Sequence, residues 1–164
     1  MDRWRAIDSE TPDAARAILA RACGSSRWID RMVSRRPFGS HDALLKAARE
    51  EWFALPESDW LEAFSHHPRI GDRAALELRF PNTYDLSANE QSGVGAARED
   101  VIAALDEGNK TYYERFGFIF IVCATGKSAG EMLTLLRARL SNHRADELRI
   151  AAEEQAKITA VRLS

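Results

Sequence analysis

The run Phe118-Ile119-Phe120-Ile121-Val122 determines which class of fold the chain can adopt, because it is the clearest strand-like segment in the sequence. β-Branched and aromatic residues fit the half-buried surface of a pleated sheet. No partner strand is evident elsewhere, and a lone strand would leave its backbone hydrogen-bonding groups unpaired. We therefore expect residues 118–122 to form a buried helical turn or an extended passage within an all-α fold.

Helical patterns surround this run on both sides. Ser128-Ala129-Gly130-Glu131 matches a capping box that opens one helix, and a last helix is expected over residues 145–161. Toward the N-terminus, Thr11-Pro12 places a cap and a first-turn proline before a helix that ends near Gly24. Further helices are expected from Asp42 to Pro56, over residues 60–67 and 72–80, and after Ser87. The sequence predicts about six to eight helices in a single compact domain over residues 1–164.

Composition and charge exclude several classes of protein. Lys and Arg total 23 and Asp and Glu total 25, so the chain lacks the positive charge typical of nucleic-acid-binding domains. The longest apolar stretch, residues 116–124, is far shorter than the ~20 residues that span a membrane. The first residues lack the apolar segment of a signal peptide. We expect a cytoplasmic protein that binds neither nucleic acid nor membrane, with Cys23 and Cys123 as free thiols.

The pair His66-His67, followed by Pro68, is the first candidate for catalysis. Proline disfavours the helical conformation of the residue before it, so His67 should lie where a helix gives way to a loop. Histidine is the side chain best suited to proton transfer near neutral pH. The alternative is that these are surface or helix-capping histidines without a role in catalysis.

Glu90 and Gln91 form a second candidate, at the expected start of a helix. Backbone N–H groups at a helix N-terminus can bind anionic or polar ligands. The alternative is structural, because Glu90 is also the last residue of a capping box in which it reaches back to Ser87. The residues alone leave both interpretations open.

A metal site would have to draw on residues such as His66, His67, Asp72, Glu90 and His143. Adjacent histidines on a helix point roughly 100° apart, so they do not face one ion together. The sequence contains no His-Glu-x-x-His or Cys-x-x-Cys pattern. We therefore expect no metal. Cys23 lies at a helix C-terminus, where the helix dipole raises a thiol pKa, and is expected to be structural.

The sequence resembles the 2-oxo-4-hydroxy-4-carboxy-5-ureidoimidazoline (OHCU) decarboxylases over nearly its whole length. The most specific matching segment is His67-Pro68-Arg69-Ile70-Gly71-Asp72. The other matching segments are Cys23-Gly24-Ser25 with Trp28, Arg36-Pro37-Phe38, Asp59-Trp60-Leu61, Ser87 to Gln91, Phe116-Gly117-Phe118, Arg139-Leu140-Ser141-Asn142, Lys157-Ile158 and Arg162-Leu163. One departure is Ala22, where many members have a second cysteine outside the catalytic positions.

This resemblance implies an all-helical enzyme that works without a cofactor, usually as a homodimer. Its substrate would be a small ureidoimidazoline carboxylate, which it decarboxylates to (S)-allantoin during urate degradation. The resemblance also assigns residues: His67, Glu90 and Arg162 are catalytic. Substrate-contacting positions would be Pro68, Ser87, Ala88, Asn89, Glu90, Gln91, Ile119, Phe120, Ile121, Val122 and Cys123.

Arg162 is the least expected of these residues, because residues this close to a chain end are usually frayed. Ile158, Val161 and Leu163 could nevertheless anchor the last helix on the core and so hold Arg162 in a defined position.

Two other functions remain open from the sequence. One is a non-enzymatic helical binding module on the same scaffold, which the simultaneous presence of His67, Glu90 and Arg162 disfavours. The other is a metal-dependent hydrolase of ureido or imidazoline substrates, which metal analysis of the purified protein would separate from a decarboxylase.

Overall fold

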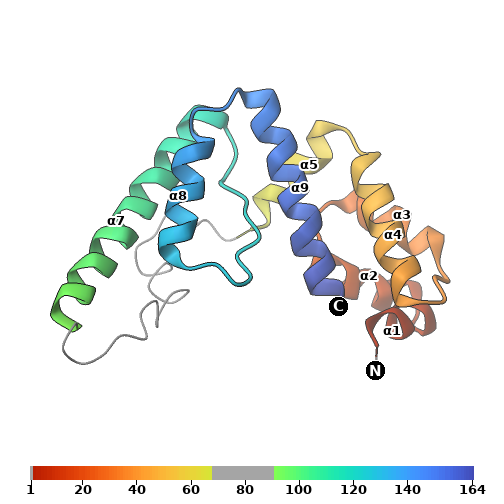
Figure 1. Cartoon of the computed structure of the whole chain (residues 1–164). Helices are drawn as coiled ribbons and strands as arrows, with labels where there is room; N and C mark the ends of the chain where they lie inside the picture. Colours follow the sequence, from red (N-terminus) through yellow and green to blue (C-terminus); the bar gives the residue numbers. More distant parts are fainter. Residues whose placement is uncertain (1, 68–90) are drawn as a thin grey trace. The chain divides into compact units, whose positions relative to one another are not determined.

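The computed structural model describes residues 2–67 and 91–164, with side chains from residue 99 onward in the second range. The described residues form eight α-helices and no strand, which confirms the all-α prediction (Figure 1). They fall into two compact units, one made of Met1–His67 with Arg149–Ser164 and the other of Pro68–Leu148. The predicted helix over 72–80 and the predicted cap at Ser87 lie outside the described residues. The single domain over residues 1–164 stays a prediction.

The first unit contains five helices from the N-terminal part of the chain and most of the last helix. They are α1 (Arg3–Ser9), α2 (Pro12–Ala22), α3 (Ser26–Arg35), α4 (His41–Phe53), α5 (Glu57–Ser65) and α9 (Arg144–Leu163). The cap predicted at Thr11 is present, because its side chain accepts a hydrogen bond from the Ala14 N–H at 3.2 Å. Neither α1 nor α3 was predicted, because α1 is short and α3 carries several charged residues.

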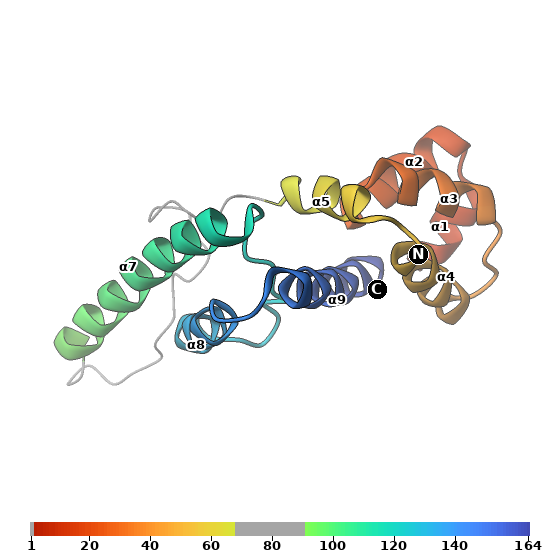
Figure 2. The same ribbon diagram turned by 90° about the horizontal axis from the view of Figure 1, so that it is seen from above.

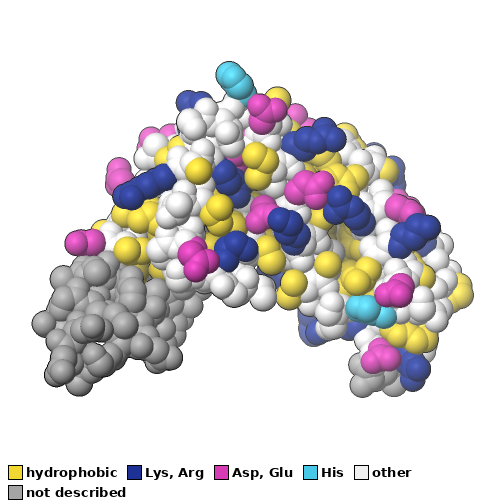
Figure 3. Space-filling model, viewed as in Figure 1, with side chains coloured by type: hydrophobic (Ala, Val, Ile, Leu, Met, Phe, Trp, Pro, Cys, Tyr) yellow, Lys and Arg dark blue, Asp and Glu magenta, His cyan; other side chains and the backbone are white. Residues whose placement is uncertain are grey.

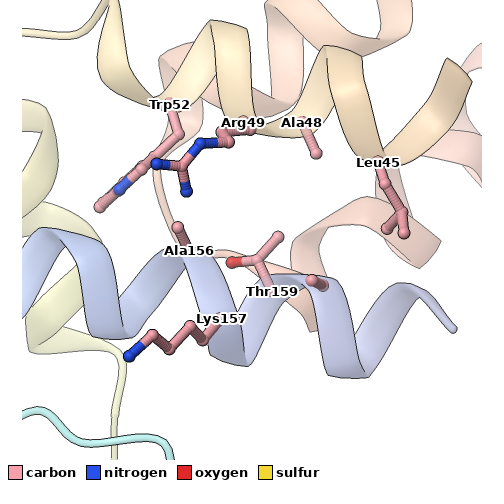
Figure 4. A pocket seen from close by; sticks show the side chains of 8 residues that line it. Leu45, Ala48, Arg49, Trp52, Ala156, Lys157 and Thr159 are labelled. Atoms are coloured by element: carbon pink, nitrogen blue, oxygen red, sulfur yellow. The ribbon is translucent and has the colours of Figure 1, made fainter. Parts of the chain in front are cut away.

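Three tryptophan indoles connect the helices of this unit. Trp28 Nε1 donates to the Ala48 carbonyl at 3.0 Å, which ties α3 to α4. Trp60 Nε1 on α5 donates to the carbonyl of Trp52 at 2.9 Å. Trp52 Nε1 in turn donates to the Ala152 carbonyl of α9 at 2.9 Å. Helices α5 and α9 are therefore both fixed to α4, and α4 and α9 run side by side in the close view of Figure 4.

The second unit contains α7 (Gln91–Phe116), α8 (Ala129–Arg139) and the first residues of α9. Helices α7 and α8 pack side by side in both views (Figures 1 and 2). The cap predicted at Ser128 is present, since its hydroxyl accepts from the Glu131 N–H at 3.2 Å. Residues 118–123 form no helix or strand, and all but Ile119 are buried. Of the two predicted alternatives, a buried helical turn and an extended passage, the structure shows a buried passage without helix.

The last helix runs from Arg144 to Leu163, slightly beyond the predicted residues 145–161. Its anchors differ in part from those predicted. Val161 is 50% exposed, so its predicted packing on the core is wrong. Leu163 is fully buried as expected, and Gln155 and Thr159 are buried although both are polar. The apolar pattern missed these two residues because a polar side chain can be buried when it is hydrogen-bonded.

The surface carries charges of both signs. Figure 3 shows Lys and Arg interspersed with Asp and Glu over the face in view, with no region of a single sign dominating it. Among the described residues, no helix is both long enough and apolar enough to cross a lipid bilayer.

Candidate active site

Helix α5 ends just before the two adjacent histidines. The backbone N–H groups of His66 and His67 donate to the carbonyls of Ala63 and Phe64 at 3.2 and 3.1 Å. The helix therefore closes in a tight turn, and His67 lies at the boundary between helix and loop, as predicted. The His67 side chain is half-buried whereas the His66 residue is exposed, so the two neighbours occupy different environments.

A chain of polar groups extends from His67 into the first unit. The Nε2 atom of His67 contacts the side-chain oxygen of Gln155, which is fully buried on α9. The amide nitrogen of Gln155 donates to the Thr159 hydroxyl at 3.1 Å, one helical turn further along. The Thr159 hydroxyl donates to the Ala22 carbonyl at the end of α2, at 3.4 Å. We call this series the His67 polar chain. Neither Gln155 nor Thr159 was predicted from the sequence as a site residue.

Arg162 reaches the same carbonyl from the end of α9. Its Nη1 atom donates to the Ala22 carbonyl at 3.4 Å. The helix continues to Leu163, whose side chain is fully buried, so the turn that carries Arg162 is held on the core. Two candidate residues that are far apart in the sequence, His67 and Arg162, are therefore linked to one backbone group within the first unit.

The Cys23 thiol lies beside this chain and is not activated. Burial raises the pKa of the Cys23 thiol to about 11, although the nearby hydrogen-bonding groups of Ser25 and Thr159 and the charge of Arg162 act in the opposite direction. The thiol is therefore protonated near neutral pH. The predicted direction is right, but the main cause is burial and not the helix dipole.

The segment between α2 and α3 packs tightly against the end of α5. A Cβ atom at Gly24 would lie 2.6 Å from Cγ of His66, so only glycine allows this approach. The Glu62 carboxylate of α5 accepts from the Ser26 N–H at 2.8 Å and from the Ser26 hydroxyl at 2.9 Å. These contacts position the end of α5, and with it the loop that carries His67.

In the second unit, buried charged groups support the extended passage. Arg139 on α8 donates from Nη1 to the Ile121 carbonyl at 2.6 Å and pairs with Glu147 at 2.5 Å. Glu147 is fully buried and also accepts from the Tyr112 hydroxyl at 2.5 Å. Burial, followed by the hydrogen bond to Glu147, raises the pKa of the Tyr112 phenol. We call Arg139, Glu147 and Tyr112 the Arg139 cluster.

A second side chain also holds this passage. Lys127 Nζ donates to the Cys123 carbonyl at 2.8 Å. The carbonyls of Ile121 and Cys123 are thus satisfied by cationic side chains in place of a neighbouring strand. The family resemblance implied that this segment contacts the substrate, but the side chains that support the segment were not predicted.

The remaining candidate residues lie outside the described residues. They are Pro68, Ser87, Ala88, Asn89 and Glu90, and for Gln91 only the backbone at the start of α7 is described. Within residues 2–67 and 99–164, no three His, Cys, Asp or Glu side chains come together as a possible metal site.

A pocket of about 240 Å³ lies between α4 and α9 in the first unit (Figure 4). Leu45, Ala48, Arg49 and Trp52 line it from α4, and Ala156, Lys157, Thr159 and Ala160 line it from α9. None of the candidate catalytic residues lines this pocket. The combination of an imidazole with a guanidinium, which suits proton transfer and binding of an anionic oxygen, occurs instead at the His67 polar chain.

Comparison with known proteins identifies similar sequences. A family model described as OHCU decarboxylase matches residues 8–164. The uric acid degradation bifunctional protein TTL of Arabidopsis thaliana is 37% identical over 143 residues, which are 87% of this chain and 44% of that protein. The 2-oxo-4-hydroxy-4-carboxy-5-ureidoimidazoline decarboxylase of Amia calva is 36% identical over 134 residues, 79% of this chain and 74% of the relative. The chain spans less than half the length of the bifunctional relatives that it matches.

Solved structures give the same result. The crystal structure of an OHCU decarboxylase in the presence of (S)-allantoin matches with a TM-score of 0.71 at 34% sequence identity, over 94% of this chain and 96% of that one. The crystal structure of an (S)-allantoin synthase matches with a TM-score of 0.70 over 98% of this chain and 52% of that one. At 16% identity, this second likeness is one of fold alone.

Proposed function

This chain belongs to the OHCU decarboxylase family, and we propose that it decarboxylates 2-oxo-4-hydroxy-4-carboxy-5-ureidoimidazoline to (S)-allantoin in urate degradation, without a cofactor. The observation that carries the proposal is the linkage of His67 and Arg162, through Gln155 and Thr159, to the Ala22 carbonyl. This linkage holds an acid–base side chain and an anion-binding side chain in one part of the first unit.

The proposed reaction replaces a carboxylate with a proton. The bond to the carboxylate breaks, carbon dioxide leaves, and the electron pair moves toward the neighbouring C=N bond, so the substrate is its own electron sink. The ring nitrogen that receives these electrons takes up a proton. The hydroxyl-bearing carbon becomes a carbonyl as its O–H proton is lost, and a proton is added to one face of the ureido-bearing carbon, so the carboxylate is exchanged for one proton overall. The protein needs to position the carboxylate, stabilise the developing charge and deliver this proton.

We assign the proton transfer to His67, because the Gln155 contact and the turn at the end of α5 hold its ring in place. Arg162 would bind an anionic or carbonyl oxygen of the substrate with its planar guanidinium. Glu90 would accept from the ureido or ring N–H groups. The segments Ser87–Gln91 and Ile119–Cys123, together with Pro68, would supply substrate contacts.

We further propose that the protein acts in the cytoplasm as a homodimer. The family resemblance supports the dimer, and light scattering on the purified protein would test it. Cys23 and Cys123 are both buried and are not joined by a disulfide, in keeping with a reducing compartment.

The proposed activity can be tested by generating the unstable intermediate from urate in situ and following the optical activity of allantoin. Addition of the protein should accelerate the appearance of (S)-allantoin over the uncatalysed, racemic product. The rate should be unchanged after dialysis against EDTA. An unaltered optical signal would support a binding module, whereas recovery of activity only on adding a divalent metal would support the hydrolase.

A further inference from the structure

We propose that Gln155 is a positioning residue that holds His67 in the Nε2–H form, which leaves Nδ1 as the nitrogen that exchanges a proton with the substrate. The catalytic part of this inference rests on the proposed function of His67. The protonation pattern of the ring does not depend on that function, because it is inferred from the Gln155 contact and from the hydrogen bonds of Gln155 and Thr159.

The Ala22 carbonyl can only accept a hydrogen bond, and this fixes which groups donate in the His67 polar chain. The Thr159 hydroxyl has a single proton, and it is donated to that carbonyl at 3.4 Å. The hydroxyl oxygen must then accept from Gln155, whose NH₂ group lies 3.1 Å away. The amide oxygen of Gln155 is thereby turned toward Nε2 of His67. An amide oxygen cannot donate, so Nε2 must carry a proton.

The reverse orientation of the amide would break this series. It would place the amide NH₂ group against Nε2 of His67 and the amide oxygen against the hydroxyl of Thr159. The Thr159 proton would then be drawn away from the Ala22 carbonyl, which would keep the hydrogen bond from Arg162 but lose the one from Thr159. Gln155 is fully buried, so water does not readily replace a lost partner of its amide. The Cys23 thiol next to Thr159 is a weaker acceptor than the carbonyl, and its raised pKa keeps it neutral.

The arrangement has a consequence for the proposed catalysis. In a neutral imidazole with a proton on Nε2, Nδ1 carries the lone pair and can accept a proton; in the imidazolium, Nδ1 donates one. The Gln155 contact thus assigns the two ring nitrogens different tasks, with one for orientation and the other for chemistry. Because Gln155 is uncharged, it orients the ring without adding a charge beside it.

Nitrogen NMR of the protein labelled with ¹⁵N-histidine tests the inference directly. The chain has 4 histidines, and the His67 signals are assigned by their loss in His67→Ala. Above the titration range of the ring, His67 should show a protonated Nε2 and an unprotonated Nδ1. Gln155→Leu should give a mixture of the two neutral forms and lower kcat about tenfold, with KM nearly unchanged.

Two further variants act as controls. Gln155→Glu keeps an acceptor oxygen next to Nε2, so it should retain the Nε2–H form. Glu153 lies on α9, as Gln155 does, and forms an exposed ion pair with Arg49 of α4. Glu153→Gln alters this pair and should change neither the His67 spectrum nor kcat. If Gln155→Leu fails to fold, Thr159→Val replaces it, because loss of the hydroxyl frees the amide to turn and should also mix the two forms.

A His67 ring protonated on Nδ1 in the parent protein would overturn the inference. So would a Gln155→Leu or Thr159→Val variant with the parent's spectrum and kcat. The expected spectra in a parent protein without decarboxylase activity would instead refute the proposed function and leave the orientation of His67 established.

Discussion

The His67 polar chain and the Arg139 cluster solve a similar problem with different chemistry. Each one holds a candidate segment in place by linking it to buried groups. The His67 polar chain does so with an uncharged amide and a hydroxyl, whereas the Arg139 cluster uses a buried ion pair and a phenol. A neutral chain can set which nitrogen of a histidine carries a proton. A charged cluster instead holds backbone carbonyls that lack a strand partner, and is costly to disrupt because an unpaired buried charge remains.

The largest loss of activity is expected on substitution of His67, at one end of the His67 polar chain. His67→Ala should lower the decarboxylation rate about 10²–10⁴-fold, because it removes the proposed acid–base group. His66→Ala should remain within a few-fold of the parent, since His66 is exposed and not part of the chain. Rates on the intermediate generated in situ, with circular dichroism as a check on folding, measure both. Equal losses in the two variants would show that the assignment to His67 is wrong.

Substitutions in the Arg139 cluster should lower the stability of the fold more than substitutions in the His67 polar chain. Arg139→Met leaves the buried Glu147 carboxylate without its cation and removes the donor to the Ile121 carbonyl. The free energy of unfolding should fall by about 3–5 kcal/mol. Urea denaturation followed by circular dichroism measures the change. Arg137→Met, on an exposed face of the same helix, is the matched control and should change stability by about 0.5 kcal/mol or less.

A substitution of Arg162 can distinguish a role in turnover from a role in folding. Arg162→Lys keeps the charge but lacks the planar pair of donors, so decarboxylation should fall about tenfold or more while the midpoint of thermal unfolding hardly moves. Calorimetry and the rate assay on the same preparation provide the two readouts. Near-normal turnover in the lysine variant would mean that Arg162 serves only to hold the end of α9 at the Ala22 carbonyl.

The last expected change is in the stability contributed by Cys23, and it appears only at high pH. Its pKa rises from 9.0 to about 11 on folding, so the neutral thiol is favoured in the folded protein. The resulting stability is fully present below pH 9 and is lost as the pH rises through 11, by about 2–3 kcal/mol at most. Urea denaturation between pH 8 and 11 should therefore show a smaller decline in Cys23→Ala than in the parent. Parallel declines would assign the loss to other groups, such as Tyr112.

Much of the helical framework could be predicted from local signals. Thr11-Pro12 and Ser128 identified helix starts because capping depends on residues only a few positions apart. The absence of a partner strand excluded a strand at 118–122 but left a buried helical turn and an extended passage as alternatives. Helix α3 was missed even though its buried Trp28, Ile29 and Met32 follow helical spacing, because charged residues interrupt this short apolar pattern.

Local sequence determined that His67 would lie at the end of a helix, because a proline restricts the residue directly before it. Family resemblance pointed to Arg162 near the end of the chain. Only the tertiary structure showed that Gln155 and Thr159 connect His67 to Ala22, and that Arg139 supports Ile121. The physical reason is that a buried polar side chain is stable only with its hydrogen-bond partner, and partners that lie far apart in the chain leave no periodic pattern in the sequence.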